Sequence, residues 1–474
     1  MKLSILRAAA EAPGRTALVH RGETLSFADL AAEVRAAAAS RSRRGVDPLT
    51  PKGAKQRAAL PGDSTREALV LVYALAELGV PMVLLHPRST AAERRRTLAA
   101  TGTGIFLDPA DLRLRPEVDP EPFEPLAIDP ERPLAIVRTS GTAGPPKGVV
   151  LSRRAFAAAA QASAENLGWR GDDRWLLSLP VAHVGGLSIL TRCLIARRTA
   201  VAEPLPRFAA AAAARLVERR RITLLSLVPT MLRRLLDLDG WRPPAHLRAI
   251  LVGGAAVPPA LLERAGRRGW PVLLTYGLTE ACSQVATQRY GTAPRSGRGA
   301  EPLPGVEVRI RGGVIELRGP SLLSGYLPPP AEPVVTDDGW LCTGDLGELD
   351  AEGRLHVLGR ADEVIVTGGE NVHPREVERA LLEHPAITAA CVFGVDDDEW
   401  GQAVAAALVA DPPPGDRELL SFLAERLAPH RRPRWVAFLD ALPATASGKE
   451  DRRLAARRAA PHLRPLDRPS RPGL

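Results

Sequence analysis

The sequence predicts a large α/β domain over residues 1–360, made of layered α/β subdomains and a small antiparallel β subdomain, followed by a small α+β domain over residues 361–474. The chain has 474 residues, more than one hydrophobic core usually holds. In the first half, Ala/Leu-rich helical segments alternate with short apolar runs, which is the α/β pattern. Short strands between glycine turns begin after residue 304, and strands mix with helices after residue 360.

The elements of the first half follow from this alternation. We predict helices at Phe27–Ala39 and Arg66–Leu78 and buried strands at Val80–Leu85 and Leu134–Val137. The segment Asp47–Asp63 is rich in Pro, Gly and charge without a clear period, so it predicts a loop. Further elements are a plain Ala-rich helix and two short strands that each lead into a glycine turn: Phe208–Val217, Ala249–Val252 and Val272–Leu274.

The later elements are shorter. Strands at Val306–Ile310, Val314–Leu317 and Leu355–Leu358 predict the small antiparallel subdomain. The C-terminal domain should contain four strands and two helices, in the order Glu363–Val366 (strand), Pro374–Glu383 (helix), Ile387–Val395 (strand), Ala403–Val409 (strand), Asp416–Leu427 (helix) and Trp435–Phe438 (strand). The Pro/Arg-rich end from about Pro461 predicts disorder.

The charge, the cysteines and the apolar runs of the sequence limit the classes of protein to which the chain could belong. The net charge of +9 is scattered, and its Arg-rich stretches lack interleaved aromatic residues, so we expect no nucleic-acid partner. The four cysteines are far apart in sequence and read as free thiols. The N-terminus lacks a secretory apolar run, and no stretch approaches the ~18 apolar residues of a membrane span. We therefore expect a cytoplasmic enzyme, of unknown oligomeric state, with small-molecule substrates.

The most informative motif is Thr139–Gly148 (TSGTAGPPKG), which follows a predicted strand. Its glycines Gly141, Gly144 and Gly148 let backbone N–H groups approach a polyanion. The hydroxyls of Thr139, Ser140 and Thr142 donate hydrogen bonds, and Lys147 supplies a positive charge. It is not a Walker A loop, because Gly148 follows the lysine where that loop has Ser or Thr. The motif predicts a phosphate-binding loop, with an ordinary surface turn as the alternative.

Further motifs follow in order, and together with this loop they resemble the adenylate-forming superfamily of acyl-CoA synthetases, adenylation domains and luciferases. The resemblance covers most of the chain and rests on Tyr276–Glu280 (YGLTE), Thr343–Asp345 (TGD), Gly359–Asp362 (GRAD), Gly368–Asn371 (GGEN) and Pro443–Lys449 (PATASGK). It implies an ATP-dependent ligase that activates a carboxylic acid as its acyl-AMP and transfers the acyl group to coenzyme A.

The resemblance assigns the nucleotide residues. Tyr276, with Gly277, packs on the adenine, and the turn at Gly254 borders the same site. Thr279 donates to the α-phosphate and Glu280 holds Mg²⁺, a hard cation that prefers oxygen ligands. Asp345 accepts both ribose hydroxyls, with Arg360 nearby. Without the resemblance, Asp345 could equally be a residue that caps a turn, and Glu280 could be a carboxylate that the dipole at a helix N-terminus favours.

The same resemblance assigns Lys449 to the reaction centre, where a fixed ammonium stabilises the charge that builds up during adenylation. The small domain then swings about a hinge at Asp362 for thioester formation, and Gly368 and Gly369 line the pantetheine tunnel. Lysine is scarce in this Arg-rich chain, so its presence at Lys147 and Lys449 fits a need for a compact point charge.

The acyl site is expected at Leu179–Ser188, a segment similar to that of aryl-CoA ligases, in which His183 lines or gates the pocket. A lone His in an apolar run is otherwise more often a core residue. With Leu251–Gly254 and Thr279–Gln284, the segment looks most like that of the o-succinylbenzoate CoA ligases of menaquinone synthesis. That substrate has two carboxylates, so Arg192, or Ser283 with Gln284, should bind the second; a surface role for Arg192 is equally open.

The sequence departs from the family pattern in two places. The region from Ala36 to Arg66 is short and irregular, and Ala143 stands where many relatives have Thr.

Other functions are compatible with the same motifs. Other aryl- or fatty-acyl-CoA ligases, and adenylation enzymes that load a carrier protein, share every motif named here. A silent binding protein should have lost Lys449 or Glu280, and this chain retains both.

Overall fold

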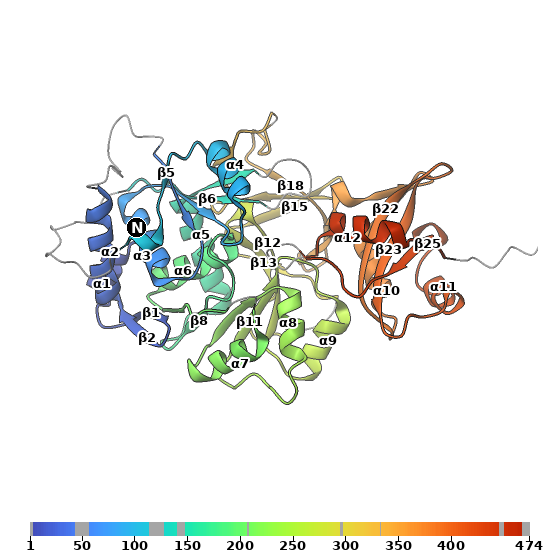
Figure 1. Cartoon of the computed structure of the whole chain (residues 1–474), viewed down its shortest axis with the longest axis horizontal. Helices are drawn as coiled ribbons and strands as arrows, with labels where there is room; N and C mark the ends of the chain where they lie inside the picture. Colours follow the sequence, from blue (N-terminus) through green and yellow to red (C-terminus); the bar gives the residue numbers. More distant parts are fainter. Residues whose placement is uncertain are drawn as a thin grey trace, which may run out of the picture.

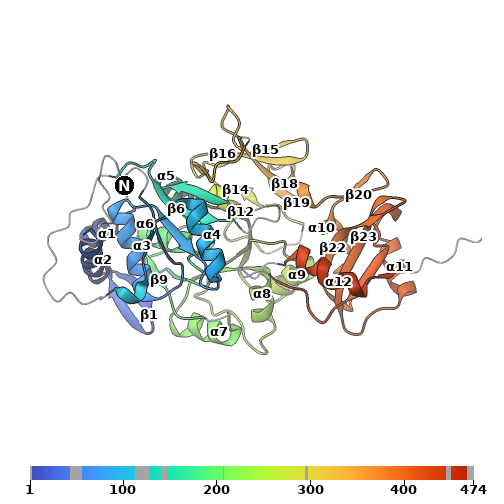
Figure 2. The ribbon, with the colours of Figure 1, turned by 45° about the horizontal axis from the view of Figure 1, so that its top comes forward.

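A computed structural model describes residues 3–42, 56–112, 128–139, 147–205, 208–293, 297–331, 333–444 and 450–466. Figure 1 shows a large unit, blue to yellow, beside a smaller C-terminal unit in orange and red. The large unit contains a nine-stranded and a six-stranded sheet, with a separate four-stranded sheet next to the C-terminal unit (Figure 2).

The nine-stranded sheet has the order β14-β13-β12-β11-β10-β8-β9-β1-β2. Its central strands are parallel, and antiparallel strands complete both edges. The strands are β1 (Thr16–His20), β2 (Glu23–Ser26), β8 (Arg174–Leu176), β9 (Thr199–Val201), β10 (Leu224–Leu227), β11 (Ala249–Gly253), β12 (Val272–Leu278), β13 (Ser283–Thr287) and β14 (Glu301–Pro302).

The six-stranded sheet has the order β17-β7-β6-β4-β3-β5. Its strands are β3 (Ala58–Pro61), β4 (Met82–Leu85), β5 (Ile105–Phe106), β6 (Pro133–Arg138), β7 (Gly148–Ser152) and β17 (Gly325–Leu327). The predicted loop at Asp47–Asp63 is wrong at its end, because Ala58–Pro61 forms the buried strand β3, parallel to β4. Two of these four residues are Ala and one is Pro, so the segment has too little pattern to reveal a strand.

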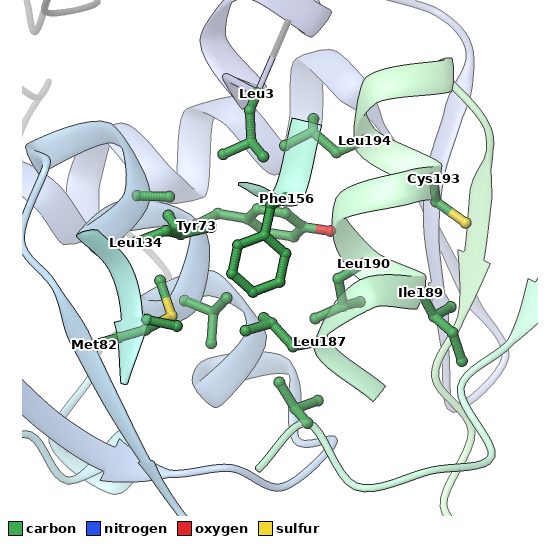
Figure 3. Packing of buried hydrophobic residues seen from close by; sticks show 14 of the residues in the cluster. Leu3, Tyr73, Met82, Leu134, Phe156, Leu187, Ile189, Leu190, Cys193 and Leu194 are labelled. Atoms are coloured by element: carbon green, nitrogen blue, oxygen red, sulfur yellow. The ribbon is translucent and has the colours of Figure 1, made fainter. Parts of the chain in front are cut away.

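Helices separate and cover the two sheets. α5 contacts β7 of one sheet and β13 of the other, and α3 is buried along almost its whole length. Figure 3 shows Tyr73 of α3, Phe156 of α5 and Leu190 of α6 packed together in this layer. The helices of the large unit are α1 (Ile5–Glu11), α2 (Phe27–Ser42), α3 (Arg66–Leu78), α4 (Ala91–Thr101), α5 (Arg153–Leu167), α6 (Val184–Ala196), α7 (Ala210–Arg219), α8 (Pro229–Leu236) and α9 (Pro259–Arg267).

The antiparallel subdomain contains β15 (Glu307–Arg311), β16 (Val314–Arg318), β18 (Leu341–Leu349) and β19 (Leu355–Arg360), in that order across the sheet. The β15–β16 hairpin points away from the sheets of the large unit, and β19 contacts α10 of the C-terminal unit (Figure 2). This sheet therefore lies at the junction of the two units.

The C-terminal unit is an α+β structure with its own core, built from residues 365–466. Its elements are β20 (Ile365–Thr367), β21 (Glu370–Val372), α10 (Pro374–Leu381), β22 (Ile387–Asp397), β23 (Gly401–Ala410), α11 (Asp416–Ala424), β24 (Trp435–Phe438), α12 (Arg452–Ala459) and β25 (Arg464–Pro465). The predicted disorder from Pro461 is wrong up to Leu466, because β25 pairs with β24 and Leu466 is buried. Residues 467–474 lie outside the described part.

Candidate active site

Tyr276, Asp345 and Arg360 form one cluster, as the motifs predicted. Asp345 and Arg360 face each other in the register of β18 and β19, and Tyr276 lies near the end of β12. The Tyr276 hydroxyl donates to Asp345 Oδ2 at 2.6 Å, and Arg360 Nη1 donates to Asp345 Oδ1 at 3.2 Å. Each carboxylate oxygen thus has one protein donor and retains a lone pair for another.

The electrostatics of this cluster follow from burial and from the two carboxylates beside Arg360. Burial, then the negative charge of Asp345, raises the pKa of Tyr276, so its hydroxyl remains a donor. Burial alone would lower the pKa of Arg360, but hydrogen bonds and charge from Asp362 and Asp345 outweigh it and raise the pKa. Arg360 Nε donates to Asp362 Oδ1 at 3.0 Å, which links the cluster to the proposed hinge residue.

Glu280 lies in a second cluster with Tyr326 and Lys147. The Tyr326 hydroxyl donates to Glu280 Oε1 at 3.0 Å, and Lys147 Nζ lies 5.6 Å from the centroid of the Tyr326 ring. Pairing of β17 with β7 places Tyr326 beside Val149, just after the phosphate loop. Among the described residues only Oε1 of Glu280 has a hydrogen-bond partner, which leaves Oε2 available to a cation.

Tyr326 was missed at the sequence level. It belongs to none of the recognised motifs, and its closeness to Glu280 arises only from the long-range pairing of β7 with β17. The chain has only four tyrosines, and Tyr276 and Tyr326 both donate a hydroxyl to a site carboxylate. Scarcity of tyrosine was the one signal that could have pointed to Tyr326.

The phosphate loop is closed at its base. The backbone N–H of Thr139 donates to the carbonyl of Lys147 at 3.1 Å, and Arg138 pairs with Gly148 in the β6–β7 register. The two strands therefore bring both ends of the motif together. The remaining predicted loop residues, Ser140, Gly141, Thr142 and Gly144, lie outside the described residues.

The two glycines predicted at the nucleotide site have structural reasons of their own. A Cβ at Gly277 would lie 1.8 Å from the carbonyl oxygen of Ser283, so β12 and β13 can approach only with glycine there. Gly254 has a φ of 82°, a left-handed conformation that favours glycine after β11. Thr279 begins the turn after β12 that carries Glu280.

His183 stands at the N-terminus of α6, and its ring lies 5.2 Å from that of His86, centroid to centroid. His86 comes directly after β4, so the six-stranded sheet also contributes to this region. Nε2 of His86 is buried without a hydrogen-bond partner among the described residues. His86 was not singled out from the sequence.

Arg192 is buried, at 3% exposure, which excludes the surface role left open by the sequence. It lies over the Trp175 ring, 5.6 Å from the centroid, and its Nε and Nη2 have no hydrogen-bond partner in the described ranges. Burial lowers the pKa of Arg192 to about 10, so the guanidinium remains charged near neutral pH. Its charge interacts with Cys282, next to the Thr279–Ala281 turn.

Ser283 and Gln284 begin β13, against which α6 packs. Ser283 has a φ of 96°, which a non-glycine residue rarely adopts. Gln284 Nε2 donates to Thr287 Oγ1 at 2.9 Å, but its buried Oε1 lacks a partner in the described part of the chain. The helix and the strand thus both carry unsatisfied buried polar atoms.

Gly368 and Gly369 form the turn between β20 and β21 in the C-terminal unit, with φ values of 59° and 81°. A Cβ at Gly368 would lie 2.4 Å from the Trp400 ring, so glycine is required there by packing as well as by conformation. Lys449 lies outside the described residues. Shortly after it, Arg452 donates to Glu378 of α10 and so anchors α12.

The chain belongs to the AMP-binding enzyme family. The family's main domain matches residues 5–327, and the AMP-binding enzyme C-terminal domain matches residues 376–449. The family resemblance inferred from the motifs is therefore confirmed.

Two relatives are similar over almost the whole chain. The 2-succinylbenzoate–CoA ligase of Bacillus pumilus (strain SAFR-032) is 35% identical over 94% of this chain and 96% of its own. The o-succinylbenzoate CoA synthetase of Bacillus subtilis with the acyl-adenylate intermediate has a TM-score of 0.84 and 34% identity, covering 95% of this chain and 96% of its own. The predicted fold class, a large N-terminal α/β domain with a small C-terminal domain, is confirmed.

Other complexes of the B. subtilis enzyme differ in their similarity. The complex with ATP and a magnesium ion has a TM-score of 0.84 at 33% identity, covering 95% of this chain and 98% of its own. A double mutant bound to a product analogue has a TM-score of only 0.70 at 34% identity, covering 96% and 97%. The present structure therefore resembles the ATP and acyl-adenylate complexes more than the product-analogue complex.

Three further features of the described residues are their cysteines, their candidate metal ligands and the length and apolar character of their helices. Cys193, Cys282 and Cys391 are buried and Cys342 is exposed, all as free thiols. Within the described ranges no three His, Cys, Asp or Glu side chains gather to hold a metal ion. No helix there is long and apolar enough to cross a membrane.

Proposed function

We propose that this chain is an ATP-dependent o-succinylbenzoate CoA ligase that works through an acyl-AMP intermediate. The observation that supports the ligase chemistry is that Asp345 and Glu280 each accept a hydrogen bond from a tyrosine hydroxyl, and that Lys147 of the phosphate loop lies over the ring of the second tyrosine. The observation that supports o-succinylbenzoate as the acid is the buried guanidinium of Arg192, whose Nε and Nη2 have no hydrogen-bond partner among the described residues. Similarity to 2-succinylbenzoate–CoA ligases over 94% of the chain supports both.

The residues present fit a nucleotide. Asp345 has one protein donor on each oxygen, so each can still accept one of two neighbouring ribose hydroxyls. Tyr276 and Arg360 hold the carboxylate in place and limit its rotation. Thr139 and Lys147, at the base of the closed loop, would bind phosphate oxygens.

Glu280 is the residue that would hold Mg²⁺. Its Oε1 is fixed by Tyr326, and a carboxylate oxygen is the ligand that Mg²⁺ prefers. When bound, Mg²⁺ supplies positive charge that stabilises the phosphate oxygens. Tyr326 keeps its proton because burial, then Glu280, raises its pKa, and so it orients the carboxylate as a donor.

In the first half-reaction a carboxylate oxygen of the acid attacks the α-phosphorus of ATP and pyrophosphate leaves. Thr279, in the turn after β12, would donate to the α-phosphate, and Lys449 would stabilise the charge that builds on it. Neither group needs to transfer a proton, so their work is positioning and electrostatic stabilisation.

The acyl pocket would bind the second carboxylate of the acid. Arg192 offers two nitrogen donors, Nε and Nη2, that have no partner in the part of the chain the structure describes, in a planar fork that suits a carboxylate. Ser283 is the further candidate on the adjoining strand, whereas Gln284 Nε2 already donates to the hydroxyls of Thr275 and Thr287. His183, at the start of the same helix as Arg192, would line the pocket toward the aromatic ring.

In the second half-reaction the thiol of CoA attacks the acyl carbonyl and AMP leaves. We propose that the domain boundary lies at residues 360–361, since the C-terminal core begins at Ile365. Rotation about Asp362 would bring Gly368 and Gly369 to the thiol. The difference between TM-scores of 0.84 and 0.70 with two complexes of one enzyme supports two arrangements of the units.

The experiment is a pyrophosphate-release assay with o-succinylbenzoate, benzoate and octanoate, each with and without CoA. The proposal expects ATP-dependent release with o-succinylbenzoate and a CoA thioester when CoA is present. Transfer to a holo carrier protein but not to CoA would instead identify a carrier-loading enzyme. A cytoplasmic location remains a prediction that rests on the free cysteines.

A further inference from the structure

A cavity lies at the edge of the nine-stranded sheet opposite the nucleotide residues. It encloses about 220 Å³ and is lined by Thr16, Arg174 and Thr199, the first residues of β1, β8 and β9, and by Thr223 just before β10. These strands are parallel, so their amino ends meet at this edge. The proposed nucleotide site uses the carboxyl ends of the same sheet, as open α/β sheets usually do.

Four arginines line this cavity: Arg15, Arg174, Arg198 and Arg221. Hydrogen bonds from three of them go to backbone carbonyls, those of Gly171, Arg220, Arg170, Ala196 and Arg197. Within the described ranges none of the four forms an ion pair with a carboxylate. A carbonyl oxygen carries only a partial charge, so the positive charges in the cavity are not neutralised.

The two acidic residues of the cavity offset only part of the positive charge of the four arginines. Asp173 is buried and already engaged, by Arg248 Nη2 at 2.7 Å and by the Thr223 hydroxyl at 2.8 Å. Asp172 is exposed and can offset one charge. Burial is the main cause that lowers the pKa of Arg198; the nearby charge of Arg15 adds to it, and Asp173 and Asp172 oppose it.

We propose that this cavity is a binding site for a small multivalent oxyanion, either a phosphate or a polycarboxylate. Guanidinium groups bind both through paired N–H donors. The volume is below the ~300–1,000 Å³ of pockets for drug-sized ligands, so the occupant is compact. The site is separate from the acyl and nucleotide residues, and the proposed reaction does not use it.

The test is calorimetric titration of the full chain with inorganic phosphate and, separately, with citrate, at constant ionic strength and without nucleotide or Mg²⁺. The variant combines Arg15→Gln with Arg221→Asn. Both side chains are exposed, and Asn tolerates the φ of 49° at position 221. The control is Arg219→Gln, an exposed arginine of α7 that does not line the cavity.

We expect at least one of the two anions to bind the wild type and the control equally, and the double variant about tenfold or more weakly, since two charged donors are lost. The anion whose binding weakens identifies the chemical class. Adenylation activity of the double variant should match the wild type, which shows that it folds and separates this outcome from failure of the proposed function. Equal binding of both anions by the double variant, or no binding by the wild type, would overturn the proposal.

Discussion

The two ends of the proposed active site are built in opposite ways. At the ribose end, Asp345 already has a protein donor on each oxygen, from Tyr276 and Arg360. At the acyl end, Arg192 and Gln284 are buried with polar atoms that have no partner among the described residues. One end is held in place by its own contacts, and the other is left incomplete.

This difference indicates which end of the site provides affinity for ATP and which end provides selectivity for the acid. A carboxylate fixed by two neighbours pays little to order itself when the nucleotide binds, so the ribose end supplies uniform binding of ATP. A buried charge without a partner is costly, and the ligand that satisfies it is strongly preferred over one that does not. We therefore propose that this chain selects its acid at the acyl end.

The largest effect is expected at Lys449, which the family resemblance assigns to the reaction centre. Lys449→Ala should slow adenylation by ~10²–10³, the usual result of losing one preorganised donor, and leave thioester formation from supplied acyl-AMP largely intact. Separate assays of pyrophosphate release and of thioester formation measure the two steps. Lys449→Arg, which keeps the charge, is the matched control and should recover part of the rate. Equal damage to both half-reactions would contradict the proposed domain movement.

Removal of the Asp345 carboxylate should weaken the binding of ATP at the ribose end. Asp345→Ala leaves Tyr276 and Arg360 without their shared acceptor and should raise the KM for ATP roughly 10–100-fold, with kcat much less affected. Steady-state kinetics with ATP as the varied substrate measure this. Asp338→Ala, an exposed carboxylate on the approach to β18, is the control and should leave KM unchanged. A fall in kcat alone would show that Asp345 does not act through nucleotide binding.

The Mg²⁺ assignment can be sharpened at Glu280. Glu280→Gln keeps an acceptor for the Tyr326 hydroxyl but removes the charge that a cation needs, so half-maximal activity should require about tenfold more Mg²⁺. Activity measured over a range of Mg²⁺ concentrations at fixed ATP gives the shift. Tyr326→Phe should produce a smaller shift in the same direction. Wild-type Mg²⁺ dependence in Glu280→Gln would refute the assignment.

The smallest effect is expected at Tyr276. Tyr276→Phe retains the ring against the adenine and removes only the 2.6 Å hydrogen bond to Asp345. A hydrogen bond to a charged carboxylate is worth ~1.5–3 kcal/mol, but Arg360 still holds Asp345, so we expect only part of this to be lost from nucleotide binding and KM for ATP to rise roughly 2–10-fold. If the change equals that of Asp345→Ala, the hydroxyl and not the carboxylate is the main ribose contact.

The sequence predicted the nucleotide cluster better than its surroundings. Asp345 and Arg360 belong to neighbouring strands of one antiparallel sheet, so motifs that recur in order suffice to bring them together. Tyr326 is brought in by the pairing of the distant strands β7 and β17, and His86 by a ring contact with His183, and no local pattern reveals either. The burial of Arg192 could not be predicted from the sequence either, because an arginine in an apolar helix can extend to solvent or stay buried.

Short elements account for the errors in the fold. Arg464–Pro465 has only two residues, too few for a period-2 pattern, and Ala58–Pro61 has four residues without an alternation of apolar and polar types. Both become strands because a neighbour offers an open edge, β4 in one case and β24 in the other. The 13-residue helix Arg66–Leu78 and the four-residue strand Trp435–Phe438, which has two large aromatic side chains, were predicted with the observed bounds.

The most direct test of the acyl end compares kcat/KM for o-succinylbenzoate, benzoate and octanoate in the wild type, Arg192→Met and Arg192→Lys. In the wild type we expect o-succinylbenzoate to exceed benzoate by ~10⁴, the ratio typical of a site built to satisfy buried polar groups. Arg192→Met should lower this ratio roughly 10–100-fold and Arg192→Lys should lower it less. An unchanged ratio in Arg192→Met, or octanoate equal to o-succinylbenzoate in the wild type, would contradict the account.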